Sequence, residues 1–228
     1  MYRLSVLALG FLLSLLPACA AAAPPRVTTT TTTTIASVVD PPPAPSLDPL
    51  AATFPAIPVM GKSVYTPVQL VEWYRSKKIV QAPGSCATVE ELAILFVTEG
   101  ARENVRGDLA FIQAMLETGW LRHSTRVPAS YCNYSGIGAV DSGTTANQFD
   151  NALMGVRAQI HHLRAYADTT VTCSNFKTPN ASPRCHLVKP KGKAKTWNEM
   201  GNGMWASDPY YSIKFLNLFA DLQKLIPK

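Results

Sequence analysis

The sequence has few charged residues, at 16% against roughly 25% in an average soluble domain. It has one long uncharged and mostly apolar run, residues 4–16, at the extreme N-terminus. These scarcities exclude a membrane protein with several spans and a long coiled coil, while 47% hydrophobic residues exclude a wholly disordered chain. The 21 Lys and Arg outnumber the 15 Asp and Glu, which gives a net charge of +6.

Proline is unevenly distributed along the chain. Ten of the 18 prolines lie before residue 60, and residues 28–34 are seven consecutive threonines. A segment of this composition buries too little apolar surface to fold, and its prolines favour an extended backbone. The sequence therefore predicts a disordered spacer over 20–60 and one domain, 61–228, long enough for a single core.

The N-terminus has the pattern of an export signal. One Arg precedes the apolar run, which is too short to span a bilayer as a stable helix. Residues 16–19, Leu-Pro-Ala-Cys, resemble a bacterial lipobox, so residues 1–19 are predicted to be a signal peptide with Cys19 lipidated. The protein would then be an exported lipoprotein on the outer face of the cytoplasmic membrane or cell wall. Ordinary cleavage within the alanines 20–23 is the alternative and would give a secreted protein.

The number of cysteines agrees with a lipidated Cys19. Removing it from the five leaves four cysteines, which in an oxidising compartment suggest two disulfides with three possible connectivities. Cys173 and Cys185 flank a short loop rich in Pro, Asn and Ser, so we predict the pairs Cys173–Cys185 and Cys86–Cys132. No C-x₂-C occurs and the four His lack ligand spacing, so we expect neither a metal nor another cofactor.

Hydrophobic periodicity and capping residues predict a mostly α domain. The predicted helices cover 67–78, 88–102, 109–120 capped by Asp108, 149–167, and a last helix opened by 207–209. The third of these is apolar on nearly every side, as expected of a central helix. The adjacent His161 and His162 are expected to be partly exposed on the fourth. Residues 121–148 lack helical periodicity and suit a small hairpin or loop lobe.

Glu117 is the ionisable residue within the predicted central helix. Burial beside Leu116 and Trp120 would raise its pKa, because the charged form loses hydration. A carboxylic acid that stays protonated near neutral pH can protonate a leaving oxygen. In the alternative, the carboxylate reaches water or Arg122 at the helix end and has no catalytic part.

Four motifs in order resemble the glucosaminidase family of peptidoglycan hydrolases, glycoside hydrolase family 73. They are Ala110–Trp120 (AFIQAMLETGW), Asn133–Gly138 (NYSGIG), Gly155–Ala167 (GVRAQIHHLRAYA) and Trp205–Tyr211 (WASDPYY). The family pattern is roughly Q-A-x-x-E-T-G-W, then N-N-x-F-G-I, and near the C-terminus an aromatic-A-x-D-P-x-Y segment. The resemblance covers residues from about 99 to 222.

The resemblance implies a lysozyme-like α fold, with a small hairpin or loop lobe, that cleaves the β-1,4 bond after N-acetylglucosamine. Glu117 would be the general acid, and Tyr211 would orient the acetamido group of the substrate. Asn133 and Gly136 match the turn that shapes the cleft floor. Trp205 is a candidate for stacking on a sugar, as is Trp197, although core packing would also account for either.

The sequence departs from the family at Cys132 and Ser135, and its second catalytic group is not evident. Glycosidases ordinarily use two carboxylates. Residues 121–148 offer one, Asp141, which would also suit a turn. The alternative is attack by the substrate's own N-acetyl oxygen, a known exception to the two-carboxylate rule. Glu99 and Asp108 are expected to serve structure.

Residues 189–195 contain four lysines. In an exported protein this charge does not indicate nucleic acid; it fits either a solvated loop or attraction to anionic wall polymers or lipid headgroups. The expected partners are therefore peptidoglycan strands and a membrane holding the lipid, with the protein a monomer. The competing interpretations are a lytic transglycosylase or muramidase of the same fold, and an inactive peptidoglycan-binding lipoprotein.

Overall fold

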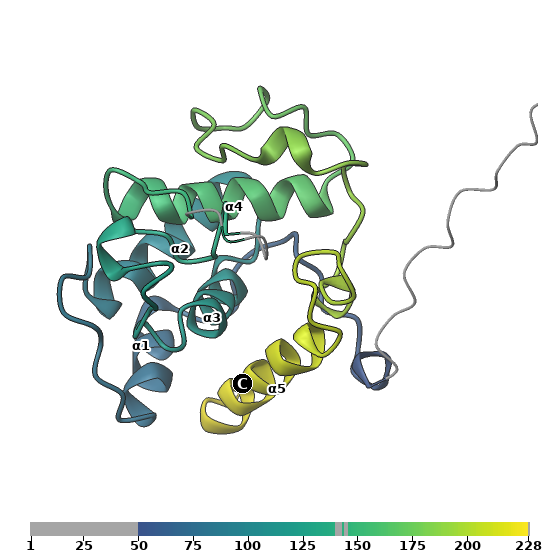
Figure 1. Cartoon of the computed structure of the whole chain (residues 1–228). Helices are drawn as coiled ribbons and strands as arrows, with labels where there is room; N and C mark the ends of the chain where they lie inside the picture. Colours follow the sequence, from purple (N-terminus) through teal and green to yellow (C-terminus); the bar gives the residue numbers. More distant parts are fainter. Residues whose placement is uncertain (1–49, 140–142, 144–145, 228) are drawn as a thin grey trace, which may run out of the picture. The chain divides into compact units, whose positions relative to one another are not determined.

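The computed structural model describes residues 50–139, 143 and 146–227. The described chain is mostly helical, with five α-helices and four short 3₁₀ turns (Figure 1). Extended pairing within these residues is limited to the isolated bridges Pro58–Thr196 and Met60–Val105. The predicted mostly α, lysozyme-like class is confirmed, while the described part of 121–148 is a loop carrying the 3₁₀ turn η2 (Ala129–Tyr131) and no hairpin. Cys19 and Asp141 lie outside the described residues.

The first two helices begin where the capping residues predict. Helix α1 (Pro67–Ser76) starts after Thr66, and α2 (Val89–Glu103) starts after Thr88. In both, the threonine side chain accepts the N–H of the third helical residue, whose own side chain accepts the threonine N–H. Helix α2 ends at Asn104, in the left-handed conformation with a φ of 54°.

Helix α3 (Gly107–Glu117) is the central helix, and all its residues but the last two are buried. Its N-cap is Arg106, so the prediction that Asp108 caps this helix is wrong. Asp108 is instead fully buried inside the first turn, where it pairs with Arg106 at 2.7 Å and accepts the N–H of Val64 at 2.8 Å. The carboxylate thus joins the start of α3 to the segment before α1, which confirms its structural role.

Helix α2 crosses α3 at two glycines. A Cβ on Gly107 would lie 2.1 Å from the Phe96 carbonyl oxygen, and one on Gly100 would lie 2.6 Å from the Gly107 Cα. No side chain fits at either position, so the two backbones meet directly. This close approach fixes the central helix, and with it Glu117 at its end.

The last two helices begin later than predicted. Helix α4 (Ala152–Ala167) is capped by Asn151, whose Oδ1 accepts the N–H of Met154. Helix α5 (Tyr211–Leu225) starts three residues after Asp208, whose carboxylate holds a turn by accepting the N–H of Tyr210. Tyr211 is therefore the first residue of α5, at the end that faces α3.

Buried ion pairs join α2 to α4. Glu99 is 1% exposed and pairs with Arg157 at 2.7 Å and Arg102 at 2.6 Å, while Glu103 pairs with Arg164 at 2.6 Å. Each buried carboxylate thus has a guanidinium partner, as burial of a charge requires. These contacts confirm the structural role expected of Glu99.

Residues 50–60 are folded onto the domain, although the sequence assigned them to the spacer. Val59 is fully buried and donates its N–H to the Lys195 carbonyl, and the side chain of Asn198 donates to the Ala51 carbonyl. The folded domain therefore includes residues 50–60, eleven residues that the prediction placed in the spacer. Long-range partners such as Asn198 supply this order, and local composition gives no sign of them.

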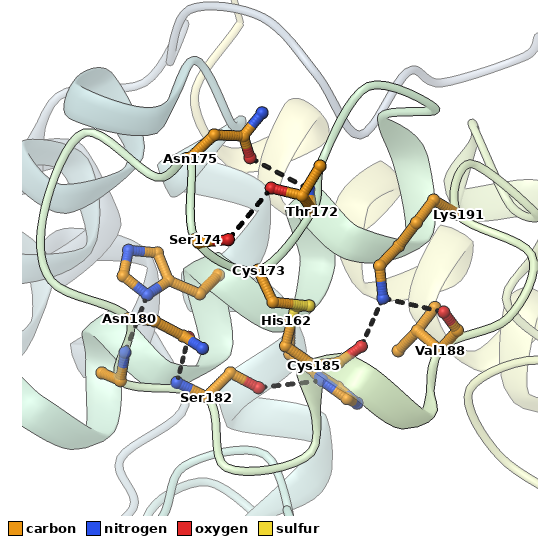
Figure 2. The surroundings of a disulfide bond; sticks show 12 residues. His162, Thr172, Cys173, Ser174, Asn175, Asn180, Ser182, Cys185, Val188 and Lys191 are labelled. Carbon is orange, nitrogen blue, oxygen red and sulfur yellow. Dashed lines mark hydrogen bonds between the residues drawn. A yellow bond between two sulfur atoms is a disulfide. The ribbon is translucent and has the colours of Figure 1, made fainter.

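Both predicted disulfides are present. Cys86–Cys132 joins the start of α2 to the lobe after α3, and Cys173–Cys185 closes a loop over α4. Around the second bond, Lys191 Nζ points at the carbonyls of Cys185 and Val188, at the turn η3 (Cys185–Leu187) (Figure 2). The coil that follows α4 is therefore held by covalent and hydrogen bonds.

This loop buries one of the two adjacent histidines more deeply than predicted. His161 is fully buried, accepts the N–H of Ala181 at 3.0 Å and stacks on Phe176 with ring centroids 4.0 Å apart. Desolvation lowers its pKa to about 4, although the adjacent Glu103 carboxylate acts in the opposite direction. The expected partial exposure is wrong because the segment from 169 onward covers the helix.

No helix within the described ranges is both long and apolar enough for a membrane span.

Candidate active site

The last residue of α3 is Glu117, at a sharp change of backbone direction. Gly119, Trp120 and Leu121 all have left-handed φ values between 58° and 64°. The Trp120 N–H returns to the Met115 carbonyl at 2.7 Å and so closes the helix end. Because the helix stops here, Glu117 is only partly buried, and its carboxylate lies at the edge of the core.

Two side chains from near the C-terminus donate to one oxygen of Glu117. The Tyr211 hydroxyl donates to Oε1 at 2.5 Å, and the Trp205 indole Nε1 donates to the same atom at 2.8 Å. The two contacts fix the carboxyl group relative to the start of α5 and to the segment that precedes it. The chain thus brings together three of the residues that the sequence singled out.

A buried amide chain supports Tyr211 from behind. Gln113, one turn before Glu117 on α3, donates from Nε2 to the Tyr211 hydroxyl oxygen at 2.8 Å. Gln159 of α4 donates to Gln113 Oε1 at 2.8 Å and to the Ala110 carbonyl at 3.0 Å. Since Gln113 takes the acceptor side of the hydroxyl, the Tyr211 proton is directed at Glu117.

Burial raises the pKa of Glu117 to about 7, because the ionised form loses hydration. The hydrogen bonds from Tyr211 and Trp205 favour the ionised form and offset part of this effect. Desolvation, with the charge of Glu117 beside it, raises the pKa of Tyr211 well above its usual range. Near neutral pH the site therefore has a neutral phenol and a carboxyl group poised between its two forms.

A pocket of about 160 Å³ opens on the other side of Glu117. Its lining residues are Glu117, Thr118, Gly119, His123, Ser124, Val127, Asn133 and Gly136. Within the described residues Glu117 is the one carboxylate in this lining. A Cβ built on Gly136 would lie 3.7 Å from Glu117 Oε2, so that oxygen faces the pocket while Oε1 is held by Tyr211 and Trp205.

Asn133 builds the turn that forms one wall of the pocket. Its side chain is fully buried; Oδ1 accepts the N–H groups of Ser135 and Ile137, and Nδ2 donates to the carbonyls of Ile137 and Asn147. All its hydrogen-bonding capacity is thus used within the protein. Asn133 shapes the wall, as expected of this turn, and places Gly136 opposite Glu117.

His123 lines the same pocket and was not singled out from the sequence. Burial lowers its pKa, and an interaction with the Val127 backbone opposes this only in part. Neither ring nitrogen makes a well-formed hydrogen bond to a described residue. A neutral imidazole therefore stands at the pocket wall.

The other candidates fall in different places. Trp197 is fully buried and stacks on Phe215 with centroids 4.2 Å apart, so it belongs to the core. Arg122 is exposed and donates to the Gly119 carbonyl at 2.8 Å, so it does not pair with Glu117. No group of three or more His, Cys, Asp or Glu suited to a metal occurs within the described ranges.

Sequence reasoning missed the roles of Gln113 and Gln159. Gln113 is part of the motif around Glu117, and its position four residues earlier places both side chains on one helix face. The spacing could therefore have pointed to Gln113. Its partner Tyr211 is 98 residues away in the sequence, and no local pattern identifies that contact.

Comparison with known proteins identifies the family to which the chain belongs. The family model described as mannosyl-glycoprotein endo-beta-N-acetylglucosaminidase matches residues 93–224, which include α3, the pocket wall and the start of α5. An uncharacterized protein of Borreliella burgdorferi is 36% identical over 134 residues, 59% of this chain. The match spans 63% of the length of that relative. The chain belongs to the glucosaminidase family of glycoside hydrolases.

Proposed function

We propose that this protein cleaves the β-1,4 bond after N-acetylglucosamine in peptidoglycan, with Glu117 as the general acid. The observation that carries the proposal is the state of this carboxyl group. Its pKa of about 7 keeps a large protonated fraction at neutral pH, and Oε2 faces a pocket next to the turn that Asn133 builds. Membership of the family supports glycoside hydrolysis, and the geometry supports the role of Glu117.

In this proposal the proton of Glu117 passes from Oε2 to the glycosidic oxygen as the bond to the anomeric carbon breaks. Oε1 cannot approach the substrate equally well, because Tyr211 and Trp205 occupy it. Their hydrogen bonds then stabilise the carboxylate that remains. For Tyr211 also to orient the acetamido group, its hydroxyl would exchange its bond to Glu117 for one to the bound substrate.

The anomeric carbon also needs a nucleophile. No second carboxylate lines the pocket among the described residues, and Asp141 lies outside them. We favour attack by the acetamido oxygen of the substrate, which forms a cyclic intermediate that water then opens. In that second step the Glu117 carboxylate accepts a proton from the attacking water.

The test is digestion of purified peptidoglycan by the full chain and by Glu117→Gln, with the new reducing ends identified by mass spectrometry. The proposal predicts N-acetylglucosamine reducing ends from the wild type and a loss of activity of at least about 100-fold in the variant. Glu72→Gln, at an exposed position of α1, is the matched control and should digest like the wild type.

Other products identify the rival functions. Anhydromuramic ends would indicate a lytic transglycosylase, and muramic reducing ends a muramidase; either would overturn the proposed bond but keep Glu117 as the acid. Binding without new ends would indicate a wall-binding lipoprotein. A Glu117→Gln protein as active as the wild type would contradict the proposed mechanism.

We further propose that the protein is exported and anchored through a lipid on Cys19. The support is the short apolar run before the Leu-Pro-Ala-Cys sequence, together with two disulfides that require an oxidising compartment. Mass spectrometry of the N-terminal peptide from a bacterial host would show diacylglycerol on Cys19. An unmodified peptide beginning within 20–23 would indicate secretion instead.

A further inference from the structure

The segment 169–198, between α4 and α5, carries a charge equal to that of the whole chain. It contains six basic residues and no Asp or Glu; they are Lys177, Arg184, Lys189, Lys191, Lys193 and Lys195. Outside this segment the chain has 15 basic and 15 acidic residues. The excess positive charge is therefore concentrated in one stretch of backbone.

Backbone hydrogen bonds hold part of this segment against the end of α4. Gly192 donates its N–H to the Ala165 carbonyl at 3.2 Å, and Ala194 donates to the Tyr166 carbonyl at 2.9 Å. Lys193 lies between these two anchored residues. Its ammonium group is 4.8 Å from the centre of the Tyr166 ring, within the range of a cation–π contact.

The same aromatic ring leads to the proposed catalytic acid. Tyr166 and Trp205 have ring centroids 5.4 Å apart, and the Trp205 indole donates to Glu117 at 2.8 Å. Lys193 is thus separated from Glu117 by two aromatic side chains. The cation therefore lies beside Tyr166, which packs on the partly exposed Trp205.

Arg184 lies near the same aromatic pair, because Ser182, two residues before it, is hydrogen-bonded to His162 Nδ1 at 3.1 Å. The ring of His162 contacts Trp205 with centroids 5.3 Å apart, and the positive charges of Arg184, Lys191 and Lys193 each lower the pKa of His162. Desolvation is the larger cause and lowers this pKa to about 3. The three positive charges therefore act on a neutral ring that packs on Trp205.

Two of these three cations are free to bind a ligand. Lys191 donates to the Cys185 and Val188 carbonyls and so holds the loop (Figure 2). Arg184 and Lys193 are partly buried and form no ion pair with a carboxylate among the described residues. Partial burial reduces screening by solvent and strengthens attraction for an anion.

We propose that Arg184 and Lys193 form an anion-binding subsite, separated from Glu117 by Tyr166 and Trp205, for carboxylate groups of the peptidoglycan strand being cleaved. The inference rests on the proposed function, because it assigns the anion to the same substrate. A lipid headgroup fits less well, since the two cations border the aromatic pair at Glu117. The exposed cations of the segment, such as Lys177 and Lys195, have no such contact.

The first test measures binding and does not depend on turnover. Full-length Glu117→Gln protein, with and without Arg184→Gln and Lys193→Gln, is titrated with peptidoglycan before and after amidation of its carboxyl groups. The subsite predicts that the double substitution weakens binding to native peptidoglycan about fivefold at low salt. Binding to amidated peptidoglycan should be unchanged, and the difference should shrink as salt is added.

Lys177→Gln with Lys195→Gln is the matched control, because it removes the same charge from exposed positions of the same segment. An equal loss in this control would indicate general attraction to polyanions and overturn the subsite. Equal losses on native and amidated peptidoglycan would also overturn it. Binding to vesicles that contain anionic lipid is measured as well. If the double substitution weakens binding to these vesicles and not to peptidoglycan, the cations serve a membrane.

The second test separates this inference from the proposed function. With Glu117 intact, the Arg184 and Lys193 substitutions should raise KM for native peptidoglycan about fivefold and leave kcat nearly unchanged. If the wild type cleaves no glycan, the proposed function fails, but the binding comparison still decides the subsite. If cleavage occurs and neither KM nor binding changes, the subsite alone is wrong.

Discussion

The Tyr211 hydroxyl lies 2.5 Å from Glu117 Oε1 and donates its proton to that oxygen, although 94 positions separate the two residues. Gln113 fixes the direction of this bond by donating to the hydroxyl oxygen from the other side at 2.8 Å. Tyr211 thereby acts on Glu117 even without substrate. The protonation of the proposed acid depends on a residue at the start of a different helix.

Replacing Tyr211 by Phe should move the pH dependence of cleavage. The lost hydrogen bond favours ionised Glu117, so without it the pKa of Glu117 rises above about 7. Because the acid must be protonated, activity that falls above pH 7 in the wild type should persist to higher pH in Tyr211→Phe. The rate at the optimum should fall about tenfold or more, since a donor to the developing carboxylate is gone. Initial rates from pH 5 to 9 measure both effects.

Trp205→Phe is the matched comparison. The substitution removes the indole N–H that donates to the same oxygen, while Phe keeps an aromatic ring in that place. It should shift the alkaline limb in the same direction but less, since the Tyr211 bond has the larger effect on the pKa. An alkaline limb that stays in place in both variants would show that a group other than Glu117 controls it.

Glu117→Gln should be more stable than the wild type at high pH. The pKa of Glu117 is raised on folding from 4.5 to about 7, so folding binds a proton between these values. Wild-type stability is therefore lost as the pH rises through this window and stays lower above it. At pH 9 the free energy of unfolding of Glu117→Gln should exceed that of the wild type by at most about 3 kcal/mol. Partial exposure of Glu117 makes the expected difference smaller than this limit.

Urea unfolding of both proteins at pH 5 and pH 9 measures this difference. The free energy of unfolding of the variant, relative to that of the wild type, should be higher at pH 9 than at pH 5. Exposed Glu72→Gln is the control and should show no such pH-dependent gain. A variant that is less stable than the wild type at pH 9 would mean that ionised Glu117 is well solvated.

The sequence was sufficient to predict the central helix and the carboxylate near its end. Residues 109–120 are apolar on nearly every side, which identified α3, and a lone carboxylate in such a helix is unusual enough to notice. The cysteine count and the short loop between Cys173 and Cys185 were likewise enough to predict both disulfides. In each case the deciding feature is a local pattern of residues or the number of cysteines.

The rest of the site depends on contacts between distant segments. Gln159, Gln113 and Tyr211 form one hydrogen-bonded chain only because α4, α3 and α5 meet, and no periodicity encodes that meeting. The burial of His161 has the same origin, since residues after 169 return over α4. Helix starts were misplaced for a related reason: Asp108 and Asp208 resemble caps but hold neighbouring backbone instead.

Removing the Cys86–Cys132 disulfide should destabilise the domain more than removing Cys173–Cys185. The first bond spans 46 residues and the second 12. By lowering the entropy of the unfolded chain, they stabilise the folded state by about 4 and about 3 kcal/mol, respectively. Cys132 also directly precedes Asn133, so Cys86→Ala with Cys132→Ala should loosen the pocket wall. Urea unfolding measures the stabilities. Equal activity losses in both double variants at a temperature where both are folded would contradict this role for the first bond.

Gly136→Ala should abolish most of the activity while costing little more stability than a similar change elsewhere. Gly136 has a φ of 64°, and a methyl group there would lie 3.7 Å from Glu117 Oε2, in the space through which substrate must approach. Gly84 has a φ of 73° with nothing within 4 Å of a built Cβ, so Gly84→Ala introduces comparable backbone strain in open space. Each substitution costs about 1–2 kcal/mol of folding free energy. Thermal unfolding should show similar losses for the two variants, and peptidoglycan digestion should fall only in Gly136→Ala. Equal activity in both would place the substrate on another side of Glu117.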